Sequence, residues 1–316
     1  MSTGTTELLT EAGLDPAAVE AVVRRALAED LGGGVDVTTV ATVPFDAEGA
    51  ADLVAREAGV VAGLPVAAAV FEAAACPEDD AGMVEGVADE AVLVEYHVSD
   101  GDKVRRGTRL ATVYGLTRDL LTAERTALNL LCHLSGVATL TRRWADALAG
   151  TGTIVLDTRK TTPGLRALEK YAVRRGGGEN KRRGLYDVAL IKDNHVVAAG
   201  GVRAAYEAVR AAFPDLAIQV EVDTIEQARE AAEVGATWLL CDNMSPDTLR
   251  EVVEAVGDKV TLEGTGGLTL RRAAEYGATG VHYLSVGALT HSAPILDIGL
   301  DLRDDDEEYE EGEDGD

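Results

Sequence analysis

The 316-residue sequence predicts an α/β protein in two parts, a β-rich first part and a parallel β/α barrel after it. Two observations predict this class. Short apolar runs alternate with helix-length spacers in the second half of the chain, and paired glycine turns separate β-rich runs in the first half. A hydrophobic content of 46% over this length is enough for a sizeable core.

The first part is expected to begin with an amphipathic helix over residues 15–30. Asp15 and Pro16 suit the cap and the first turn of such a helix. The elements expected next are strands over 50–56 and 92–98 and an alanine-rich helix over 65–75.

Gly101 and Gly107 mark two turns between β-rich runs, which is the pattern of a hairpin-built sheet. Lipoyl and biotinyl carrier domains share this pattern. The turn here lacks a lysine between flanking methionine or other hydrophobic residues, so a structural sheet is favoured over a carrier module. A long helical pattern then covers 117–148, with a break or kink expected near Ser135 and Gly136.

The second part is predicted to be a β/α barrel because six apolar runs are separated by helix-length spacers. The runs are TIVLD, DVALI, AIQVEV, WLLCD, VTLEG and GVHYLSVG. A dinucleotide-binding fold is disfavoured, since no strand leads into a GxGxxG turn and the glycine triplet 176–178 follows a helix instead. The sequence also has no Walker phosphate loop.

Charge is distributed very unevenly along the chain. The whole sequence has 29 Lys or Arg against 55 Asp or Glu, a net charge of −26, whereas residues 159–192 contain ten basic and three acidic residues. This basic window predicts an anion-binding site. The remaining acidity, with six lysines against 23 arginines, favours a salt-in halophile, in which concentrated salt screens self-repulsion. It argues against nucleic acid as a partner, because most of the surface would repel phosphates.

The sequence predicts a cytoplasmic protein. It contains no apolar run long enough to span a bilayer, and its N-terminus lacks a basic-then-apolar signal pattern. The three cysteines are widely spaced and indicate neither a disulfide framework nor a metal site. Residues 304–316 include ten acidic residues in thirteen and are expected to form a disordered tail.

Functional groups follow all six apolar runs, at the barrel face where active sites form. In chain order they are Thr158, Arg159 and Lys160; Lys192, Asp193, Asn194 and His195; Glu221 and Asp223; Asp242 and Asn243; Gly264, Thr265, Gly266 and Gly267; and Ser285, Val286 and Gly287. Together they suggest chemistry on a phosphorylated sugar with a second anionic reactant.

These groups are of three kinds, each suited to a different part of such a reaction. Arg159, Lys160, Arg182 and Lys192 supply cations for carboxylate or phosphate. Glu221 and Asp242 are candidates to bind Mg²⁺, to bind ribose hydroxyls, or to stabilise positive charge developing on a sugar carbon. The late glycine-rich turns resemble the phosphate cradle often found after the last barrel strands.

Several other residues in this region have structural alternatives. His195 is expected to be either a helix cap or a substrate contact, and Asp223 either a helix N-cap or a ligand. The other arginines of the basic window are expected mainly to pair with surface acids: Arg166, Arg174, Arg175 and Arg183. No histidine or cysteine cluster in the sequence has the spacing of a zinc site.

Six motifs, in order along the chain, resemble the quinolinate phosphoribosyltransferase family: TRKTTPGLRALEKYAVRRGGGEN, GLYDVALIKDNH, VEVDTIEQA, LLCDNM, LEGTGGL and SVGALTHSAPILDIGL. The resemblance covers residues 8–302, which leaves only the termini uncovered. It implies transfer of a phosphoribosyl group from phosphoribosyl pyrophosphate to quinolinate, with release of pyrophosphate and CO₂. It also implies a need for Mg²⁺ and a homodimer with shared active sites.

The fold implied by this resemblance is an N-terminal α/β open-faced sandwich followed by an incomplete β/α barrel of six to seven parallel strands. The expected boundaries are 1–130 for the sandwich with its linking helix and 131–293 for the barrel. Residues 294–303 are expected to pack back toward the first domain.

Site residues carry over from the family one by one. Arg159, Arg182 and Lys192 correspond to cations that bind quinolinate, with Thr158 and Lys181 beside them, and Lys160 lies on the phosphoribosyl pyrophosphate side. Arg125 corresponds to an arginine from the neighbouring subunit. Glu221 and Asp242 correspond to the acidic pair near ribose and metal, and with Lys160 they are the expected catalytic residues. The phosphate-binding turns correspond to Thr265, Gly266 and Gly267 and to Val286, Gly287 and Ala288.

This chain departs from the family pattern at two points. Lys181 stands where the family commonly has histidine, which replaces a titratable imidazole by a cation that is permanent near neutral pH. The second point is a Gly-Thr-Gly-Gly turn at 264–267 in place of Ala-Ser-Gly-Gly, which keeps a hydroxyl and two glycines. Two alternative functions remain at this stage: a related transferase that uses nicotinate or another anionic base, and a non-catalytic phosphosugar-binding barrel.

Overall fold

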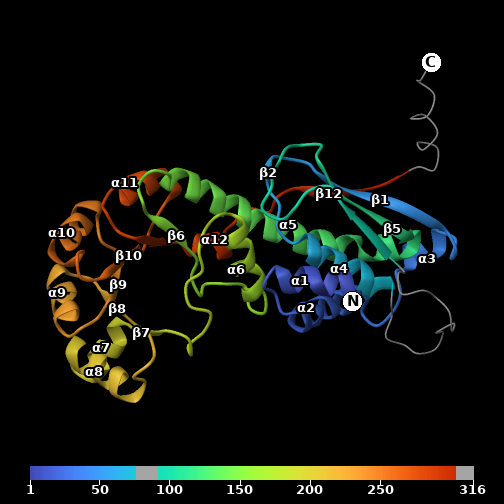
Figure 1. The fold of residues 1–316 in the computed structure, drawn as a ribbon. Coiled ribbons are helices and arrows are strands. Elements are labelled where there is room, and N and C mark those ends of the chain that lie inside the picture. The colour runs from blue at the N-terminus through green and yellow to red at the C-terminus, as the bar shows by residue number, and fades with distance from the viewer. Residues whose placement is uncertain (76–91, 304–316) are drawn as a thin grey trace. The chain divides into compact units, whose positions relative to one another are not determined.

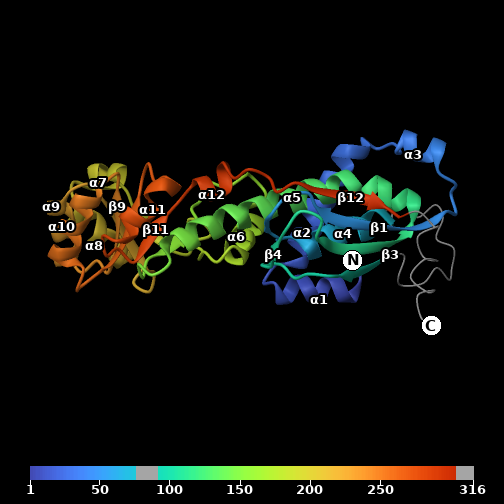
Figure 2. The same ribbon diagram turned by 90° about the horizontal axis from the view of Figure 1, so that it is seen from above.

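A computed structural model describes residues 1–75 and 92–303, which form two compact units (Figures 1 and 2). The first unit contains residues 1–139 and the segment that begins at Pro294, and the second contains residues 140–293. The expected boundary after residue 130 falls inside a helix of the first unit. The expected disordered tail, 304–316, lies outside the described residues.

The first unit is built on a four-stranded antiparallel sheet with strand order β12-β1-β5-β3. Its strands are β1 (Glu48–Ala55), β3 (Val92–Tyr96), β5 (Arg109–Leu116) and β12 (Ile298–Leu302). A separate antiparallel pair joins β2 (Gly59–Val60) to β4 (Lys103–Val104), and β4 lies between the expected turns at Gly101 and Gly107. The hairpin-built sheet predicted from the sequence is therefore present.

Helices complete the first unit: α1 (Thr3–Glu11), α2 (Pro16–Leu31), α3 (Val37–Thr42), α4 (Leu64–Ala75) and the first part of α5 (Thr117–Leu148). The predicted first helix is α2. The Asp15 side chain accepts the backbone N–H of Ala17, and Gly32 ends the helix in the left-handed conformation. Val19, Val23 and Leu27 form its buried stripe, at the four-residue spacing of one helix face.

Of the break or kink predicted near Ser135 and Gly136, the break is wrong, because α5 is continuous over its 32 residues, and the kink stays a prediction. The small residues serve close contacts instead. Ser135 Oγ accepts the N–H of Ala62 at 3.0 Å and donates to the Ala62 carbonyl at 3.2 Å. A Cβ on Gly136 would lie 2.1 Å from the carbonyl oxygen of Pro294, so glycine lets another segment cross the helix.

The second unit contains a six-stranded parallel sheet with strand order β6-β11-β10-β9-β8-β7. All six predicted runs form strands: β6 (Ile154–Leu156), β7 (Ala189–Ile191), β8 (Ile218–Val222), β9 (Trp238–Asp242), β10 (Thr261–Thr265) and β11 (Tyr283–Ser285). Within the described part of the chain β6 and β7 are the unpaired edges, so the sheet stays open, as expected of an incomplete barrel.

Helices connect these strands in the order required by a β/α layout. They are α6 (Arg166–Arg175), α7 (Asp193–Ala199), α8 (Val202–Ala212), α9 (Ile225–Glu233), α10 (Pro246–Val256), the 3₁₀ turn η1 (Leu270–Arg272), α11 (Ala273–Gly277) and α12 (Ala288–His291). Aliphatic residues fill the interior of the sheet, with Val220, Leu239 and Leu262 fully buried. None of the helices in the described ranges is long and apolar enough to cross a membrane.

Candidate functional site

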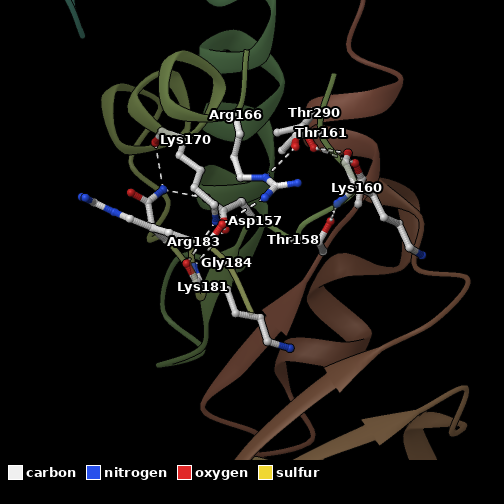
Figure 3. A network of polar contacts seen from close by, with 12 residues as sticks. Asp157, Thr158, Lys160, Thr161, Arg166, Lys170, Lys181, Arg183, Gly184 and Thr290 are labelled. Atoms are coloured by element: carbon white, nitrogen blue, oxygen red, sulfur yellow. Dashed lines mark hydrogen bonds and ion pairs between the residues drawn. The ribbon is translucent and has the colours of Figure 1, made fainter. Parts of the chain in front are cut away.

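The site is organised around a buried carboxylate, Asp157, directly after β6 (Figure 3). It accepts the ammonium of Lys170 on α6, the backbone N–H of Lys181 at 2.9 Å, and the Asn180 amide at 2.6 Å. Burial raises the pKa of the Asp157 carboxyl, although Lys170 and the two N–H donors act to lower it. This network fixes the loop after α6 against the end of β6, so two basic segments distant in sequence are brought together.

Lys160 lies beside the last glycine turn of the sheet. Its backbone carbonyl accepts the Thr290 hydroxyl at 2.8 Å, and its N–H donates to Thr158 Oγ1 at 3.0 Å (Figure 3). A Cβ on Gly287 would lie 3.0 Å from Lys160 Cδ and 3.1 Å from His291 Nε2. The lysine stem therefore passes over the glycine, where a cation and backbone N–H groups can face one phosphate group.

Arg159 and Arg182 are neighbouring cations of the site whose guanidinium groups form no ion pair among the described residues. Burial lowers the pKa of Arg182, and the positive charge of Arg159 lowers it further, against the opposing charge of Asp187. Arg182 donates to the Val188 carbonyl at 3.1 Å, while Arg159 Nε is buried without a hydrogen-bond partner in the structure. Neither guanidinium forms an ion pair with a carboxylate among the residues described. Both can therefore bind an external anion.

Two lysines of the same cluster do have carboxylate partners. Lys192 Nζ lies 2.9 Å from Glu221 Oε2, and Lys181 Nζ lies 2.6 Å from Glu263 Oε1. The Lys192–Glu221 pair is part-exposed and open to exchange with a ligand, whereas the Lys181–Glu263 pair is buried. Binding roles for Lys181, Lys192 and Glu221 stay predictions.

The structure bears on the helix-cap alternatives for His195 and Asp223, while their ligand alternatives stay predictions. His195 Nδ1 accepts the backbone N–H of Lys192 at 2.9 Å, which makes the histidine a helix cap of α7. The N-cap of α9 is Thr224, whose hydroxyl accepts the N–H of Gln227 at 3.2 Å, so Asp223 is not the cap.

The turns after β9 and β10 interlock. Asn243 has a left-handed φ of 54° and donates its N–H to the Thr265 carbonyl at 3.0 Å. Its side-chain amide donates to Asp242 Oδ2 at 2.7 Å, which orients that carboxylate. Gly266 and Gly267 continue the second turn with φ of 90° and 59°. With no side chain at either position, the backbone N–H groups of this turn can face a phosphate, as a phosphate cradle requires.

Arg125 belongs to the first unit, on α5. Its side chain is 64% exposed, and its nearest described carboxylate is Glu124, 3.7 Å from Arg125 Nη2. The expected contribution of Arg125 to a neighbouring subunit's site stays a prediction.

Sequence reasoning missed the groups that hold the site together: Asp157, Lys170, Asn180, Gln219 and Glu263. A signal for two of them was present. Gln219 and Glu263 interrupt otherwise apolar strand runs, and a polar residue inside a buried strand requires a partner. For Asp157, the last residue of TIVLD, the sequence predicts only a lead into the basic residues that follow it.

Few carboxylates at the ends of the strands are placed to bind a metal ion. Within the described ranges no three or more His, Cys, Asp or Glu side chains are grouped as metal ligands. Glu221 and Asp242, at the ends of the adjacent strands β8 and β9, offer hard oxygen donors without forming a complete cage. Such a pair suits a cation that is also held by a phosphorylated ligand. The arrangement as a whole can bind a dicarboxylate, a phosphate group and a sugar bearing developing positive charge.

Two family models match the chain. "Quinolinate phosphoribosyl transferase, N-terminal domain" covers residues 36–135, and "Quinolinate phosphoribosyl transferase, C-terminal domain" covers residues 137–301. The nicotinate-nucleotide pyrophosphorylase [carboxylating] of Mycobacterium leprae is 51% identical over 283 residues, covering 89% of this chain and 95% of that protein. A probable nicotinate-nucleotide pyrophosphorylase [carboxylating] of Bacillus subtilis is 41% identical and covers 83% and 86%.

Solved structures agree with these matches. The nicotinate-nucleotide pyrophosphorylase of Francisella tularensis superposes with a TM-score of 0.84 at 33% identity, covering 92% of this chain and 98% of that one. Human nicotinic acid phosphoribosyltransferase superposes with a TM-score of 0.62 over 89% and 74% of the two chains, and its 14% identity supports likeness of fold alone.

Proposed function

The chain belongs to the quinolinate phosphoribosyltransferase family, and on that premise we propose how its second unit carries out the family's reaction. The activity is that of nicotinate-nucleotide pyrophosphorylase (carboxylating), EC 2.4.2.19, in de novo NAD biosynthesis. Quinolinate and phosphoribosyl pyrophosphate give nicotinate mononucleotide, pyrophosphate and CO₂.

The observation that carries the proposal is the pair of neighbouring guanidinium groups, Arg159 and Arg182. Quinolinate has two adjacent carboxylates, and a planar guanidinium binds a carboxylate through two parallel hydrogen bonds. Two such groups side by side, one with a buried Nε that lacks a partner, suit a dicarboxylate better than a single anion. Lys192 lies at the edge of this pocket and can exchange Glu221 for substrate.

Phosphoribosyl pyrophosphate is proposed to bind along the opposite half of the strand ends. The supporting features are the Lys160 stem over Gly287 and the glycine turn at Gly266 and Gly267, where the space around Gly267 is open. Backbone N–H groups of the two turns hold phosphate oxygens, and the Lys160 ammonium offsets their negative charge. Glu221 and Asp242, between the two substrate positions, face the ribose.

Substitution at the ribose proceeds through an oxocarbenium-like centre. The bond from the anomeric carbon to pyrophosphate breaks and its electron pair leaves with pyrophosphate, while the pyridine nitrogen forms the new bond. Glu221 or Asp242 stabilises the positive charge on the sugar carbon, and Lys160 stabilises the departing anion. The cations hold the ring nitrogen near the anomeric carbon, which lowers the entropic part of the barrier.

Decarboxylation follows from the product of the first step. Once the ring nitrogen is quaternised, the carboxylate beside it leaves as CO₂, and the electron pair of the broken bond remains at the ring carbon next to the positive nitrogen. A proton from solvent then completes nicotinate mononucleotide. The positive ring is its own electron sink, so Arg159 and Arg182 need only hold the remaining carboxylate.

A Mg²⁺ ion fits the donor set at Glu221 and Asp242, because Mg²⁺ in such sites is usually held by one or two carboxylates together with substrate phosphates. When bound, it would supply positive charge against the pyrophosphate. We also propose a homodimer whose shared sites receive Arg125 from the neighbouring subunit, and a cytoplasmic location.

The two alternative functions have less support. A nicotinate-specific transferase would have one carboxylate to bind and no use for the second guanidinium. A non-catalytic phosphosugar-binding barrel would need neither the acidic pair nor the dicarboxylate pocket. The family relationship and the pair of arginines both favour quinolinate.

One assay tests the function directly. The protein is incubated in molar KCl with phosphoribosyl pyrophosphate, Mg²⁺ and either quinolinate or nicotinate, and CO₂ and mononucleotide are measured. High salt is used because the net charge is −26, and activity is expected to increase with KCl. CO₂ release with quinolinate is expected, without turnover of nicotinate. Turnover of nicotinate alone would replace quinolinate by the alternative base.

A further inference from the structure

Lys181 is fixed at three points, more firmly than a flexible surface lysine would be. Its backbone N–H donates to Asp157 at 2.9 Å, its carbonyl accepts the Lys170 ammonium at 3.0 Å, and its own ammonium lies 2.6 Å from Glu263. The side chain is 8% exposed. Figure 3 shows it extending away from the Asp157 network. Its position is therefore set by the fold, before any substrate binds.

Glu263 is the partner that fixes the ammonium. It lies within β10 and is fully buried, and its second oxygen accepts the Gln219 amide of β8 at 2.6 Å. Both carboxylate oxygens are thus bonded to side chains of this unit. A buried carboxylate with no cation beside it would cost several kcal/mol, so the charges of Glu263 and Lys181 depend on each other.

The Lys181–Glu263 pair is surrounded by other charged and titratable groups of the site. Arg182 and Lys192 act on Lys181 from the loop and from the end of β7, and the Cys241 thiol faces Glu263 from β9 with a pKa raised to about 12, chiefly by burial. Burial also lowers the pKa of Lys181, against the opposing effect of Glu263. The Asp157 carboxylate accepts the backbone N–H of Lys181 and forms an ion pair with Lys170.

Summing these charges gives the pocket a simple balance. Lys181 is neutralised by Glu263 and Lys192 by Glu221, while Arg159 and Arg182 have no carboxylate partner among the described side chains. The two guanidinium groups thus keep positive charge without an ion-paired carboxylate, with Asp187 acting on Arg182 only through its charge, and the dicarboxylate of the proposed function carries two negative charges. If Lys181 were replaced by a neutral residue, any negative charge that Glu263 retained would be balanced only by the guanidinium groups and would oppose the substrate carboxylates.

We propose that Glu263 is a positioning residue for quinolinate: it holds the Lys181 ammonium in place and cancels its charge, so that Arg159 and Arg182 meet the two substrate carboxylates in balance. This inference rests on the proposed function, since it assumes that quinolinate binds there. Glu263 itself touches no substrate in this account: it acts by fixing Lys181 and by the effect of its charge on the neighbouring cations.

The test is a rescue experiment with Lys181→Met, Glu263→Gln and the double variant. Quinolinate dissociation constants are measured by calorimetry, and the KM for phosphoribosyl pyrophosphate is measured alongside. Lys181→Met should weaken quinolinate binding about tenfold or more, or about 1.4 kcal/mol. The double variant should bind quinolinate at least about threefold more tightly than Lys181→Met does. Its KM for phosphoribosyl pyrophosphate should be unchanged within about twofold.

Controls separate positioning from folding. Thermal unfolding of each variant establishes that the measurements use folded protein, and Lys181→Gln replaces Lys181→Met if the latter does not fold. Glu254→Gln, on the exposed face of α10, is the matched removal of an acidic charge and should leave quinolinate affinity unchanged. Arg182→Ala is included as a probe of the pocket itself.

The outcomes are distinct. Rescue of quinolinate affinity by Glu263→Gln supports the inference. If Arg182→Ala weakens binding but the double variant binds no better than Lys181→Met, the inference fails and the proposed pocket stands. Recovery of thermal stability without recovery of affinity also overturns it, because the pair would then only stabilise the fold. Failure of the wild type to bind quinolinate overturns both proposals.

Discussion

Gly266 lies against Asn243 so closely that a Cβ built on the glycine would be 2.2 Å from the Asn243 side-chain oxygen and 2.8 Å from its backbone nitrogen. Asn243 in turn has a left-handed backbone and donates its N–H to Thr265, the residue before this glycine. The turns after β9 and β10 therefore form one rigid piece, and the orientation of Asp242 depends on the absence of a side chain at position 266.

Gly266→Ala should damage phosphoribosyl pyrophosphate binding far more than Gly267→Ala. Both glycines have positive φ, which costs alanine about 1–3 kcal/mol, but only the Gly266 methyl would collide with Asn243, while the space around Gly267 is open. Steady-state kinetics should give at least a tenfold larger loss in kcat/KM for phosphoribosyl pyrophosphate in the first variant. Equal losses would show that the clash has no bearing on the cradle.

Arg159→Ala should lower turnover at least about a hundredfold, the loss expected when an oriented charged contact is removed from a site. The Arg159 guanidinium has a buried Nε without a protein partner, so its principal contact is expected to be the substrate. Single-turnover kinetics with quinolinate measure the effect, and Arg203→Ala on α8, which pairs with Glu207, is the exposed control. Near-normal rates in Arg159→Ala would remove this residue from the proposed pocket.

Hybrid dimers should regain activity if Arg125 serves a neighbouring subunit. Arg125→Ala and Lys160→Ala are each expected to be inactive, but mixing them places an intact Arg125 and an intact Lys160 in one of the two shared sites. Activity should recover to about a quarter or less of that of the wild type, as statistical mixing and one intact site imply. Subunit exchange is checked by native mass spectrometry, and exchange without recovered activity would mean that each chain builds its own site.

Gly136→Ala should destabilise the protein although alanine favours a helix by about 1 kcal/mol over glycine. The added methyl would meet the Pro294 carbonyl oxygen at 2.1 Å, and forced overpacking costs about 1–3 kcal/mol. Urea unfolding measures the change. Gly4→Ala in α1, where the new methyl meets nothing closer than 4.0 Å, should be neutral or stabilising. A stabilised Gly136→Ala would show that the crossing segment moves aside at little cost.

Acid should remove stability that Asp52 provides. Burial opposes ionisation of Asp52, but hydrogen bonds from Arg303 and Thr112 and the charges of Arg303 and Arg109 overcome it and lower the pKa of the carboxyl. Because the pKa in the folded state lies below the unfolded value near 3.9, the stabilisation is present above about pH 4 and is lost as pH falls further.

Asp52→Asn should therefore flatten the acid limb of the stability curve. The difference in unfolding free energy between wild type and variant should shrink from pH 6 to pH 3, as measured by urea unfolding at each pH. Asp46→Asn, at an exposed position, is the control. Parallel curves for wild type and Asp52→Asn across this range would contradict the assignment.

Sequence reasoning found the six parallel strands because a strand buried on both faces is a near-continuous apolar run. It also placed most of the cations at the strand ends, since such runs end where the polar residues begin. It failed at Ser135 and Gly136, where the small residues suggested a helix break. Their role depends on two distant segments, those of Ala62 and Pro294, whose approach no local pattern records.

The sequence also could not predict which charged residues form ion pairs with each other. Lys181 was predicted to be a substrate cation, but its partner Glu263 is 82 residues away and comes from another strand. Sequence spacing does not say which carboxylate meets which ammonium, because that depends on strand order and on register. The order β10-β9-β8-β7 brings Glu263, Gln219 and the loop of Lys181 to one place, and only the fold supplies that order.

The pairing of β1 with β12 also has a consequence in time. Ala51 lies opposite Leu302, and Arg303 donates a hydrogen bond to Asp52. The first sheet therefore cannot be completed until the last described residues of the chain have been synthesised. During synthesis, the outer edge of β1 remains without its partner strand until the whole of the second unit has been translated. An open strand edge is a site of aggregation, so we expect nascent chains that stop before residue 298 to depend on chaperones or to aggregate. The first sheet is then completed only when β12 has been synthesised and has paired with β1.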